Sequence, residues 1–403
     1  MSGECWAPTK IGDFAWEPTE RATPDAEVLS VTKHRGFVPS LEYFGKQVFS
    51  KDTDNYKLVR KGQFAYATIH LDEGSIDCLR IREQGIISPM YTVFDVDERR
   101  VNRVFLLELL RTPVMLERYA AVGQGSINRR KSIGFEVLAS EIVFLPPLPE
   151  QKKIAAILSS VDEAIQATQR VIDQTRRVKE GLLQDLLTRG LPGHHTRFKQ
   201  TEIGEIPEEW EVILLDSVAQ RGSGHTPDKK HSEYWGGNIW WVSLADSHRL
   251  DAVYLSETTS KITPLGVENS SAVLHPVGTV FVSRDASVGR SAIAAVPLAV
   301  SQHFIAWRCG SRLNNHFLYY CLQHHKRRFE QIAAGSTIKT IGLGYFKAFR
   351  ISLPPLREQQ DIAARLFALD QAMWCYEGHC EHVKRVKAGL LQGLLTGKVR
   401  VIP

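Results

Sequence analysis

The sequence lacks both a hydrophobic run long enough to cross a membrane and a set of cysteines that could form a disulfide framework. Its apolar stretches stay below the roughly 18 residues that a spanning helix needs, and the start of the chain shows no basic-then-apolar signal pattern. The six cysteines, at positions 5, 78, 309, 321, 375 and 380, are scattered and include no CxxC pair. We therefore expect a cytoplasmic protein with reduced thiols.

The sequence also lacks the motifs of the common catalytic sites. It contains no GxxxxGK[ST] phosphate loop, no HExxH, no GxSxG and no Asn/Asp-Pro-Pro-aromatic tetrapeptide of amino-methyltransferases. The segment 227–230 (PDKK) resembles part of a metal-dependent nuclease motif, but no second carboxylate follows at a suitable spacing. We therefore predict a chain that is not an enzyme, has no catalytic residues, and binds neither a metal nor a cofactor of its own.

Composition leaves the partner open. The chain has 403 residues, of which 43% are hydrophobic and 24% charged, as in a globular protein of more than one domain. Lysine and arginine number 50 against 45 aspartates and glutamates, which gives a net charge of +5. This excess allows a nucleic-acid partner without requiring one.

An internal repeat organises the chain. Residues 145–190 and 353–398 align without a gap at a constant offset of 208, with 22 of 46 positions identical. Both copies begin with LPPLxEQ, continue with IAA and end with GLLQxLLT. Such agreement is typical of a duplicated structural element.

Each copy of the repeat has the heptad pattern of a long helix with one narrow apolar stripe, on which Lys179 and Lys387 also fall. At ~1.5 Å per residue, about 38 residues give a helix of roughly 57 Å. A stripe of this length needs a partner, and its own duplicate is the partner that we expect. The predicted seam residues are Ile154, Leu158, Val161, Ile165, Ile172, Leu182 and Leu186 in the first copy, and Ile362, Leu366, Leu369, Met373, Cys380, Val383, Leu390 and Leu394 in the second.

The segments that precede the two copies also correspond, at offsets that shrink from 216 to 210. This drift indicates two globular domains that share a scaffold and differ in loop length. Short β-branched runs such as Thr279–Ser283 and Leu298–Trp307 predict strands, so each domain is expected to be mixed α and β. The matching segments begin at Gly62 and Gly278, Ser88 and Ser301, Asn102 and Asn314, and Gly125 and Gly335.

These observations predict an α+β protein with a pseudo-two-fold axis. Two similar mixed domains, 1–146 and 193–354, would be joined by helices 147–192 and 355–403 that pack as an antiparallel coiled coil. A long helix pair that holds two similar domains apart suits two DNA half-sites, which lie roughly 34–36 Å apart when separated by one turn. Because the two domains differ in sequence, the target would be asymmetric and split.

The repeated motifs resemble those of the specificity subunits of type I restriction-modification systems, the HsdS family. The second half adds GHTP at 224–227, YWGGNIWW at 234–241, GSTIK at 335–339 and IGEIPEEW at 203–210, whereas the first domain lacks the GxTP and WW elements. The resemblance implies two target-recognition domains, each reading half of a bipartite double-stranded DNA target. It also implies that the helices dock two modification (methyltransferase) subunits that use S-adenosylmethionine, and that restriction subunits using ATP and Mg can be added.

Basic and hydroxyl residues in loops are the candidates for DNA contacts, since phosphates and base edges are bound by such side chains. The alternative for each of them is an ordinary solvated surface. Cys375 and Cys380 lie near His379 and His382 on one helix, but Cys380 occupies a seam position, which favours packing over a metal site. The candidate residues are Arg129, Arg130, Lys131, Arg221, Ser223, His225, Thr226, Lys229, Lys230, Arg284, Ser336 and Lys339.

Two other functions fit the same pattern. One is a recognition subunit whose partner carries both cutting and methylation on one chain. The other is a coiled-coil scaffold that holds two protein-binding domains and contacts no DNA.

Overall fold

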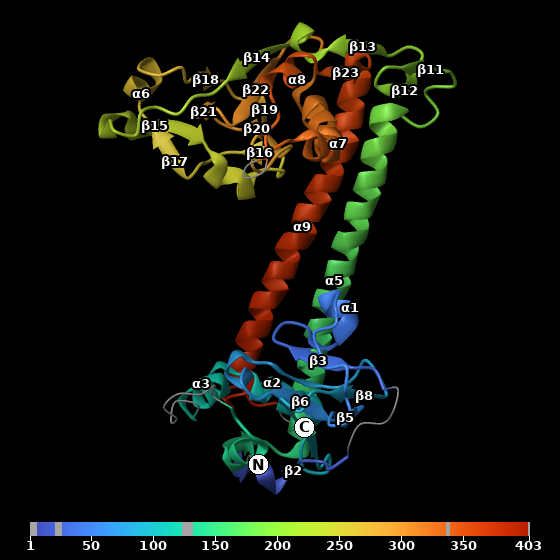
Figure 1. Ribbon diagram of the computed structural model, residues 1–403, viewed down its shortest axis with the longest axis vertical. Helices are drawn as coiled ribbons and strands as arrows, with labels where there is room; N and C mark the ends of the chain where they lie inside the picture. Colours follow the sequence, from blue (N-terminus) through green and yellow to red (C-terminus); the bar gives the residue numbers. More distant parts are fainter. Residues whose placement is uncertain (1–5, 21–25, 123–131, 336–338, 402–403) are drawn as a thin grey trace. The chain divides into compact units, whose positions relative to one another are not determined.

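The computed structural model describes residues 6–20, 26–122, 132–335 and 339–401. These form two compact units, in which residues 1–168 and 378–403 make up unit 1, and residues 169–377 make up unit 2. Two long helices, α5 (Leu148–Thr188) and α9 (Leu356–Leu394), contribute one end to each unit (Figure 1). Each unit therefore combines a globular part with a segment of both helices.

Unit 1 is built around a four-stranded antiparallel sheet with the order β2-β9-β6-β7, against which helices α2 and α3 pack. The pairs β1-β10, β3-β4 and β5-β8 are antiparallel ribbons. Its strands are β1 Ala7–Lys10, β2 Ala15–Trp16, β3 Leu29–Thr32, β4 Gly36–Pro39, β5 Lys57–Arg60, β6 Phe64–Ala67, β7 Ile76–Cys78, β8 Gln84–Ile87, β9 Tyr91–Val96 and β10 Ile142–Leu145. Its short helices are α1 Ser40–Phe44, α2 Arg103–Leu110, α3 Pro113–Val122 and α4 Phe135–Ser140.

Unit 2 has a five-stranded sheet (β14-β22-β19-β20-β16) and a four-stranded sheet (β17-β15-β21-β18), with the ribbons β11-β12 and β13-β23 beside them. The pairs β16-β20 and β15-β21 are parallel, and the others are antiparallel. The strands are β11 Phe198–Thr201, β12 Gly204–Pro207, β13 Glu211–Leu214, β14 Ala219–Ser223, β15 Trp235–Val242, β16 Tyr254–Leu255, β17 Ser260–Ile262, β18 Leu274–His275, β19 Val280–Ser283, β20 Ser291–Ala294, β21 Leu298–Val300, β22 Phe304–Cys309 and β23 Arg350–Leu353. The helices are α6 Pro264–Glu268, α7 Asn315–Ile332 and α8 Leu343–Lys347.

Equivalent polar contacts join the long helix to the globular part in both units. In unit 1, the Gln151 amide accepts from the Asn102 backbone N–H and donates to the carbonyl of Pro146. In unit 2, Gln359 accepts from the Asn314 N–H and donates to the carbonyl of Pro354. Asn102 and Asn314 in turn cap α2 and α7 with their side chains. The duplication inferred from the sequence thus extends to individual hydrogen bonds.

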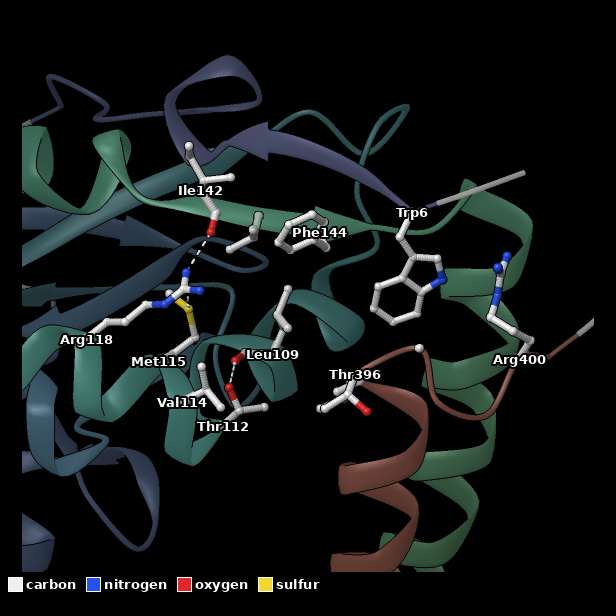
Figure 2. A pocket seen from close by; sticks show the side chains of 13 residues that line it. Trp6, Leu109, Thr112, Val114, Met115, Arg118, Ile142, Phe144, Thr396 and Arg400 are labelled. Atoms are coloured by element: carbon white, nitrogen blue, oxygen red, sulfur yellow. Dashed lines mark hydrogen bonds between the residues drawn. The ribbon is translucent and has the colours of Figure 1, made fainter. Parts of the chain in front are cut away.

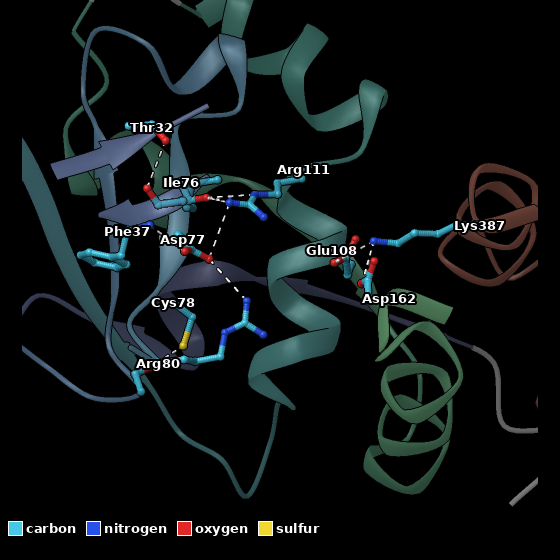
Figure 3. A network of polar contacts seen from close by, with 12 residues as sticks. Thr32, Phe37, Ile76, Asp77, Cys78, Arg80, Glu108, Arg111, Asp162 and Lys387 are labelled. Carbon is cyan, nitrogen blue, oxygen red and sulfur yellow. Dashed lines mark hydrogen bonds and ion pairs between the residues drawn. The ribbon is translucent and has the colours of Figure 1, made fainter. Parts of the chain in front are cut away.

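The two helices run antiparallel within each unit, and a Lys–Asp pair joins them there. Lys179 of α5 contacts Asp370 of α9 in unit 2, and Lys387 of α9 lies 2.8 Å from Asp162 of α5 in unit 1 (Figure 3). In each unit, one residue of the globular part also contacts the Lys–Asp pair. Tyr320 of α7 donates to Asp370 in unit 2, and Glu108 of α2 lies 3.7 Å from Lys387 in unit 1. The α+β architecture with an antiparallel helix pair is therefore confirmed.

The apolar residues of the predicted seam are buried or half-buried along both helices. Eight of them are almost fully buried, namely Ile154, Leu158, Ile172, Leu186, Ile362, Leu366, Cys380 and Leu394. The half-buried ones are Val161, Ile165, Leu182, Leu369, Met373, Val383 and Leu390.

One of the two predicted strands is interrupted in the structure. The run Leu298–Trp307 forms β21 and β22 rather than one strand, because the chain turns at residues 301–303, where the Phe304 N–H donates to the Ser301 carbonyl. The turn carries the chain from the four-stranded to the five-stranded sheet. No helix in the described part of the chain is long and apolar enough to cross a membrane.

Candidate nucleic-acid interface

An open cleft of about 710 Å³ lies in unit 2, between the β14–β15 connection, the start of the segment after β15, and the β21–β22 turn. It brings together the GHTP and WW elements that the sequence placed only in this half. The lining residues are Thr226, Lys229, Trp235, Trp241, Ser243, Leu244, Ala245, Ser260, Ser301, Gln302 and His303.

Two tryptophans of β15 hold the loop 224–230 over the cleft. The Trp241 indole donates to the His225 carbonyl at 3.0 Å, and the Trp235 indole donates to the Asp228 carbonyl at 3.3 Å. The loop begins in close contact with β21, since a Cβ on Gly224 would lie 1.8 Å from the Val300 carbonyl oxygen. Glycine at position 224 is therefore required by this close approach.

A chain of side-chain hydrogen bonds connects this loop to two neighbouring segments. The Thr226 hydroxyl donates to the Gln302 amide oxygen, and Gln302 Nε2 lies 3.5 Å from His303 Nε2. His303 Nδ1 lies 2.7 Å from a carboxylate oxygen of Asp285, which also accepts from the Thr340 hydroxyl. Asp285 follows β19, is 8% exposed and contacts both His303 and Thr340. It therefore holds the end of β19 and the segment 339–341 next to the His303 ring.

Of the predicted contact residues of this half that the structure describes, Thr226 and Lys229 line the cleft and the others do not. His225, Lys229, Lys230 and Lys339 are exposed, and the three lysines form no ion pair within the described part of the chain. Arg221 and Arg284 are instead paired with carboxylates, at 2.9 Å from Asp216 and 3.5 Å from Asp285. Their charge is partly neutralised, which weakens them as phosphate ligands. Arg129, Arg130, Lys131 and Ser336, and the side chain of Ser223, lie outside what the structure describes.

Unit 1 has the same backbone arrangement at the equivalent place with different side chains. In unit 1 the Thr68 N–H donates to the Met90 carbonyl, and the Ile133 N–H donates to the Thr68 carbonyl. In unit 2, Arg284 and Ile341 make the equivalent bonds, with the His303 carbonyl as the first acceptor. Thus Ile133 and Ile341 bond to the same strand end in the two units. In the sequence, Gly125-Ser126 and Gly335-Ser336 precede these two isoleucines.

Sequence reasoning missed Asp285, Ser301, Gln302 and His303. The offset of 213 had aligned Ser301–Phe304 with Ser88–Tyr91, but the sequence predicted a continuous strand there, which hid the turn. The Ser301 hydroxyl is fully buried and has no hydrogen-bond partner among the described residues, and it lines the cleft.

A second hollow, of about 470 Å³, lies in unit 1 between β10, α2, α3 and the end of α9 (Figure 2). Its wall is mainly apolar, with Trp6, Phe144 and Leu109 facing the space. Its arginines have partners, since Arg118 donates to the Ile142 carbonyl and Arg400 to Glu150. This chemistry does not suit a phosphate backbone.

Each long helix has a buried glutamate near its start, and this glutamate contacts residues of the segment that follows the other repeat. Arg400 contacts Glu150 at 2.8 Å, and this guanidinium lowers the pKa of the Glu150 carboxyl. Glu358 accepts from His195 at 2.8 Å and from the Trp210 indole at 3.1 Å. Burial acts to lower the pKa of His195, but Glu358 and Glu209 outweigh it, and the pKa is raised.

A buried carboxylate also organises the β3–β4 ribbon of unit 1 (Figure 3). Asp77 accepts from the Phe37 N–H at 2.9 Å and lies 3.6 Å from both Arg80 and Arg111. Gly36 allows this contact, because a Cβ there would lie 1.9 Å from the carboxylate. We interpret this network as structural, since Asp77 is buried and is engaged by the ribbon backbone and by two arginines of the same unit.

No group of three or more His, Cys, Asp or Glu side chains in the described residues is arranged to hold a metal ion. Cys375 is exposed while Cys380 is buried, so their side chains lie on different faces of α9. Asp228, the carboxylate of the PDKK segment, accepts from the Lys230 N–H in a turn.

Comparisons with known proteins identify the family of the chain. The family model described as the type I restriction modification DNA specificity domain matches residues 91–175 and 207–375. A putative type I restriction enzyme MjaX specificity subunit from Methanocaldococcus jannaschii is 29% identical over 94% of this chain and 87% of its own length. The MjaVIII specificity subunit from the same organism is 26% identical, over 99% of this chain and 94% of its own length.

Solved structures show the same fold. A chain from a type I R-M system whose complex assembly was analysed has a TM-score of 0.60 at 18% identity, with 97% of both chains covered. A type I restriction-modification S subunit from M. genitalium has a TM-score of 0.57 at 14% identity, with 98% of this chain and 97% of that chain covered. These relatives favour neither a combined restriction-methylation system nor a scaffold. The chain belongs to the type I restriction-modification DNA specificity family and is a non-catalytic DNA-recognition subunit of such a system.

Proposed function

We propose that the protein reads an asymmetric, bipartite DNA sequence, with one half-site for each globular part. The observation that carries this proposal is the shared backbone framework with different side chains at its strand end, Thr68 and Met90 in unit 1 against Arg284 and His303 in unit 2. A common framework presents its loops to DNA in the same way, whereas different side chains recognise different bases. The target-recognition domains would be 1–146 and 193–354, and the spacer helices 147–192 and 355–403.

In unit 2, the cleft and its rim would contact the half-site. Lys229, Lys230 and Lys339 are exposed and can bind phosphates, while His225 and the polar cleft wall lie where base edges can be reached. Thr226 would support the loop that carries His225 and the first two lysines. Arg221, Ser223 and Arg284 would support the same surface, and Ser336 belongs to it by sequence. In unit 1, Arg129, Arg130 and Lys131 follow Gly125-Ser126 in the sequence, as Lys339 follows Gly335-Ser336, and would act as its counterparts.

The long helices would dock the partner subunits. Assembly with other subunits of a type I system follows from the family, and we propose two modification subunits, to which two restriction subunits can be added. S-adenosylmethionine would then be bound by the modification subunits, and ATP with Mg by the restriction subunits. The cytoplasm, where the DNA and these partners are found, is the proposed location.

Genome-wide adenine methylation tests this function. The chain is expressed with its modification subunit in a host without adenine methylation, and each of the two is expressed alone as a control. We expect one new split and asymmetric methylated motif that needs both chains. A complex that assembles and methylates no new motif would contradict the proposal and favour a scaffold.

A further inference from the structure

Gln302 is the residue through which two walls of the unit 2 cleft meet. Its amide oxygen accepts from Thr226 in the loop 224–230, while its amide nitrogen lies 3.5 Å from His303 Nε2. Gln302 itself belongs to the turn at 301–303 that carries the chain from β21 to β22. A single side chain therefore ties the loop to the junction of the two sheets.

The neighbouring residues fix the orientation of this amide. A carboxylate only accepts hydrogen bonds, so Asp285, 2.7 Å from His303 Nδ1, places the ring proton on that nitrogen. In the neutral ring, Nε2 is then an acceptor and faces the Gln302 nitrogen. Oxygen toward Thr226 and nitrogen toward His303 is the orientation that satisfies both neighbours. The Gln302 side chain is exposed, but both ends of its amide have partners on the protein itself.

The bond to Thr226 controls where the exposed lysines of the loop lie. The start of the loop is held by the His225 N–H, which donates to the Val300 carbonyl. The indoles of Trp241 and Trp235 hold the loop further along by donating to its backbone carbonyls. Lys229 and Lys230 follow Thr226 by three and four residues. Without the Thr226–Gln302 bond, the middle of the loop would keep only backbone anchors and would sample more conformations, which weakens any contact that it makes.

We propose that Gln302 is a positioning residue for DNA recognition by unit 2. It holds Thr226, and with it the loop 224–230, in the shape in which the loop contacts DNA, and it does not itself distinguish bases. The position that aligns with Gln302 in unit 1 is Pro89, which has no amide, so the device belongs to unit 2. This inference rests on the proposed function.

The test uses the full chain in complex with its modification subunit, on a duplex that carries the motif methylated by the unsubstituted complex. Gln302→Leu and Thr226→Val each remove one partner, and the double variant removes both. Thr226→Ser keeps the hydroxyl. Gln220→Leu is the matched control, because Gln220 is an exposed glutamine of β14 that does not line the cleft.

We expect each single variant to raise the Kd for the specific duplex and the KM for methylation about tenfold, the effect of ~1.4 kcal/mol, with kcat unchanged. The double variant should lose no more than either single variant, since the two side chains act through one bond. Thr226→Ser and Gln220→Leu should bind as the unsubstituted chain does. Every base of the methylated motif should stay the same, and thermal unfolding of the complex should not move.

Three results would overturn the positioning role. Relaxed recognition at one base of one half-site in Gln302→Leu would make Gln302 a base contact. An approximately hundredfold loss in the double variant would mean that the two residues act independently. Unchanged binding in both single variants would remove any role. These results differ from a failure of the proposed function, in which the unsubstituted complex itself methylates no split motif.

Discussion

Replacing Lys179 by methionine tests whether the buried Lys–Asp pair stabilises the helix pairing in unit 2. The side chains of Lys179 and Asp370 are 17% and 7% exposed, and the Tyr320 hydroxyl donates to the same carboxylate at 2.7 Å. Burial, followed by the charge of Asp370, raises the pKa of Tyr320, which therefore remains a donor. Lys179→Met keeps most of the apolar stem of the side chain and removes the ammonium group, with its charge and its hydrogen-bond donors.

The expected loss follows from the carboxylate that remains. Removing one partner of a buried ion pair costs roughly 3–5 kcal/mol, because the other charge stays buried without compensation. Tyr320 still donates to Asp370, so we expect the lower end, about 3 kcal/mol. For a unit of this size that free energy corresponds to a fall in Tm of roughly 6–12 °C.

Tryptophan fluorescence during thermal unfolding measures this change. Six of the eight tryptophans, at positions 210, 235, 240, 241, 307 and 374, belong to unit 2 and report mainly on it. Arg176→Met is the matched control, since Arg176 lies on the same helix and its 3.0 Å pair with Asp173 is about half exposed. An exposed pair is worth under ~1 kcal/mol.

A second substitution separates the charge from packing. Asp370→Asn in the Lys179→Met background removes the uncompensated charge and leaves an acceptor for Tyr320, so it should recover at least half of the lost stability. The reasoning is refuted if Lys179→Met costs no more than Arg176→Met. It is also refuted if Asp370→Asn lowers the stability of Lys179→Met further.

Three further outcomes are expected. Gly224→Ala should abolish methylation of the split motif while unit 1 unfolds as before, because the new Cβ meets the Val300 carbonyl; methylation sequencing and hydrogen exchange check this. Lys387→Met should destabilise unit 1, since Asp162 and Glu108 would then face each other without a cation, and hydrogen exchange in α2 reports it. His195→Gln should lower the free energy of unfolding most below the ordinary histidine pKa of about 6.5, and progressively less as the pH rises through the raised pKa of His195. Urea titrations at several pH values measure this dependence.

The sequence was sufficient to predict the long helices and the shared scaffold. The heptad steps and the constant offset depend on the sequence alone, and they placed the start of each helix within one residue of α5 and α9. The observed helices end at Thr188 and Leu394, before the predicted ends at 192 and 403. The same alignment paired Asn102 with Asn314, which the structure shows as equivalent helix caps. These features are local or repeated, so periodicity and self-similarity reveal them.

The contacts of the cleft could not be predicted in this way. Thr226 and Gln302 are separated by 76 positions, and Asp285 and Thr340 by 55, so no periodic pattern joins them. The run from Leu298 to Trp307 is apolar and β-branched at both ends, and only the transfer between two sheets makes residues 301–303 a turn. Of the seven predicted side chains described in unit 2, six lie in loops, whereas Arg221 lies in strand β14, so the loop prediction was wrong for it. Arg221 and Arg284 are also paired with carboxylates that no sequence pattern places beside them.

The lysines on the apolar stripe illustrate how duplication and antiparallel pairing are linked. Asp162 precedes Lys179 by 17 residues, and Asp370 precedes Lys387 by the same 17. When the two copies run antiparallel, one Asp and one Lys in a single repeat generate two ion pairs, Lys179–Asp370 in unit 2 and Lys387–Asp162 in unit 1. In a parallel arrangement each residue would face its own duplicate, Asp against Asp and Lys against Lys, and like charges would oppose the pairing. The same four residues therefore favour the antiparallel register and disfavour the parallel one.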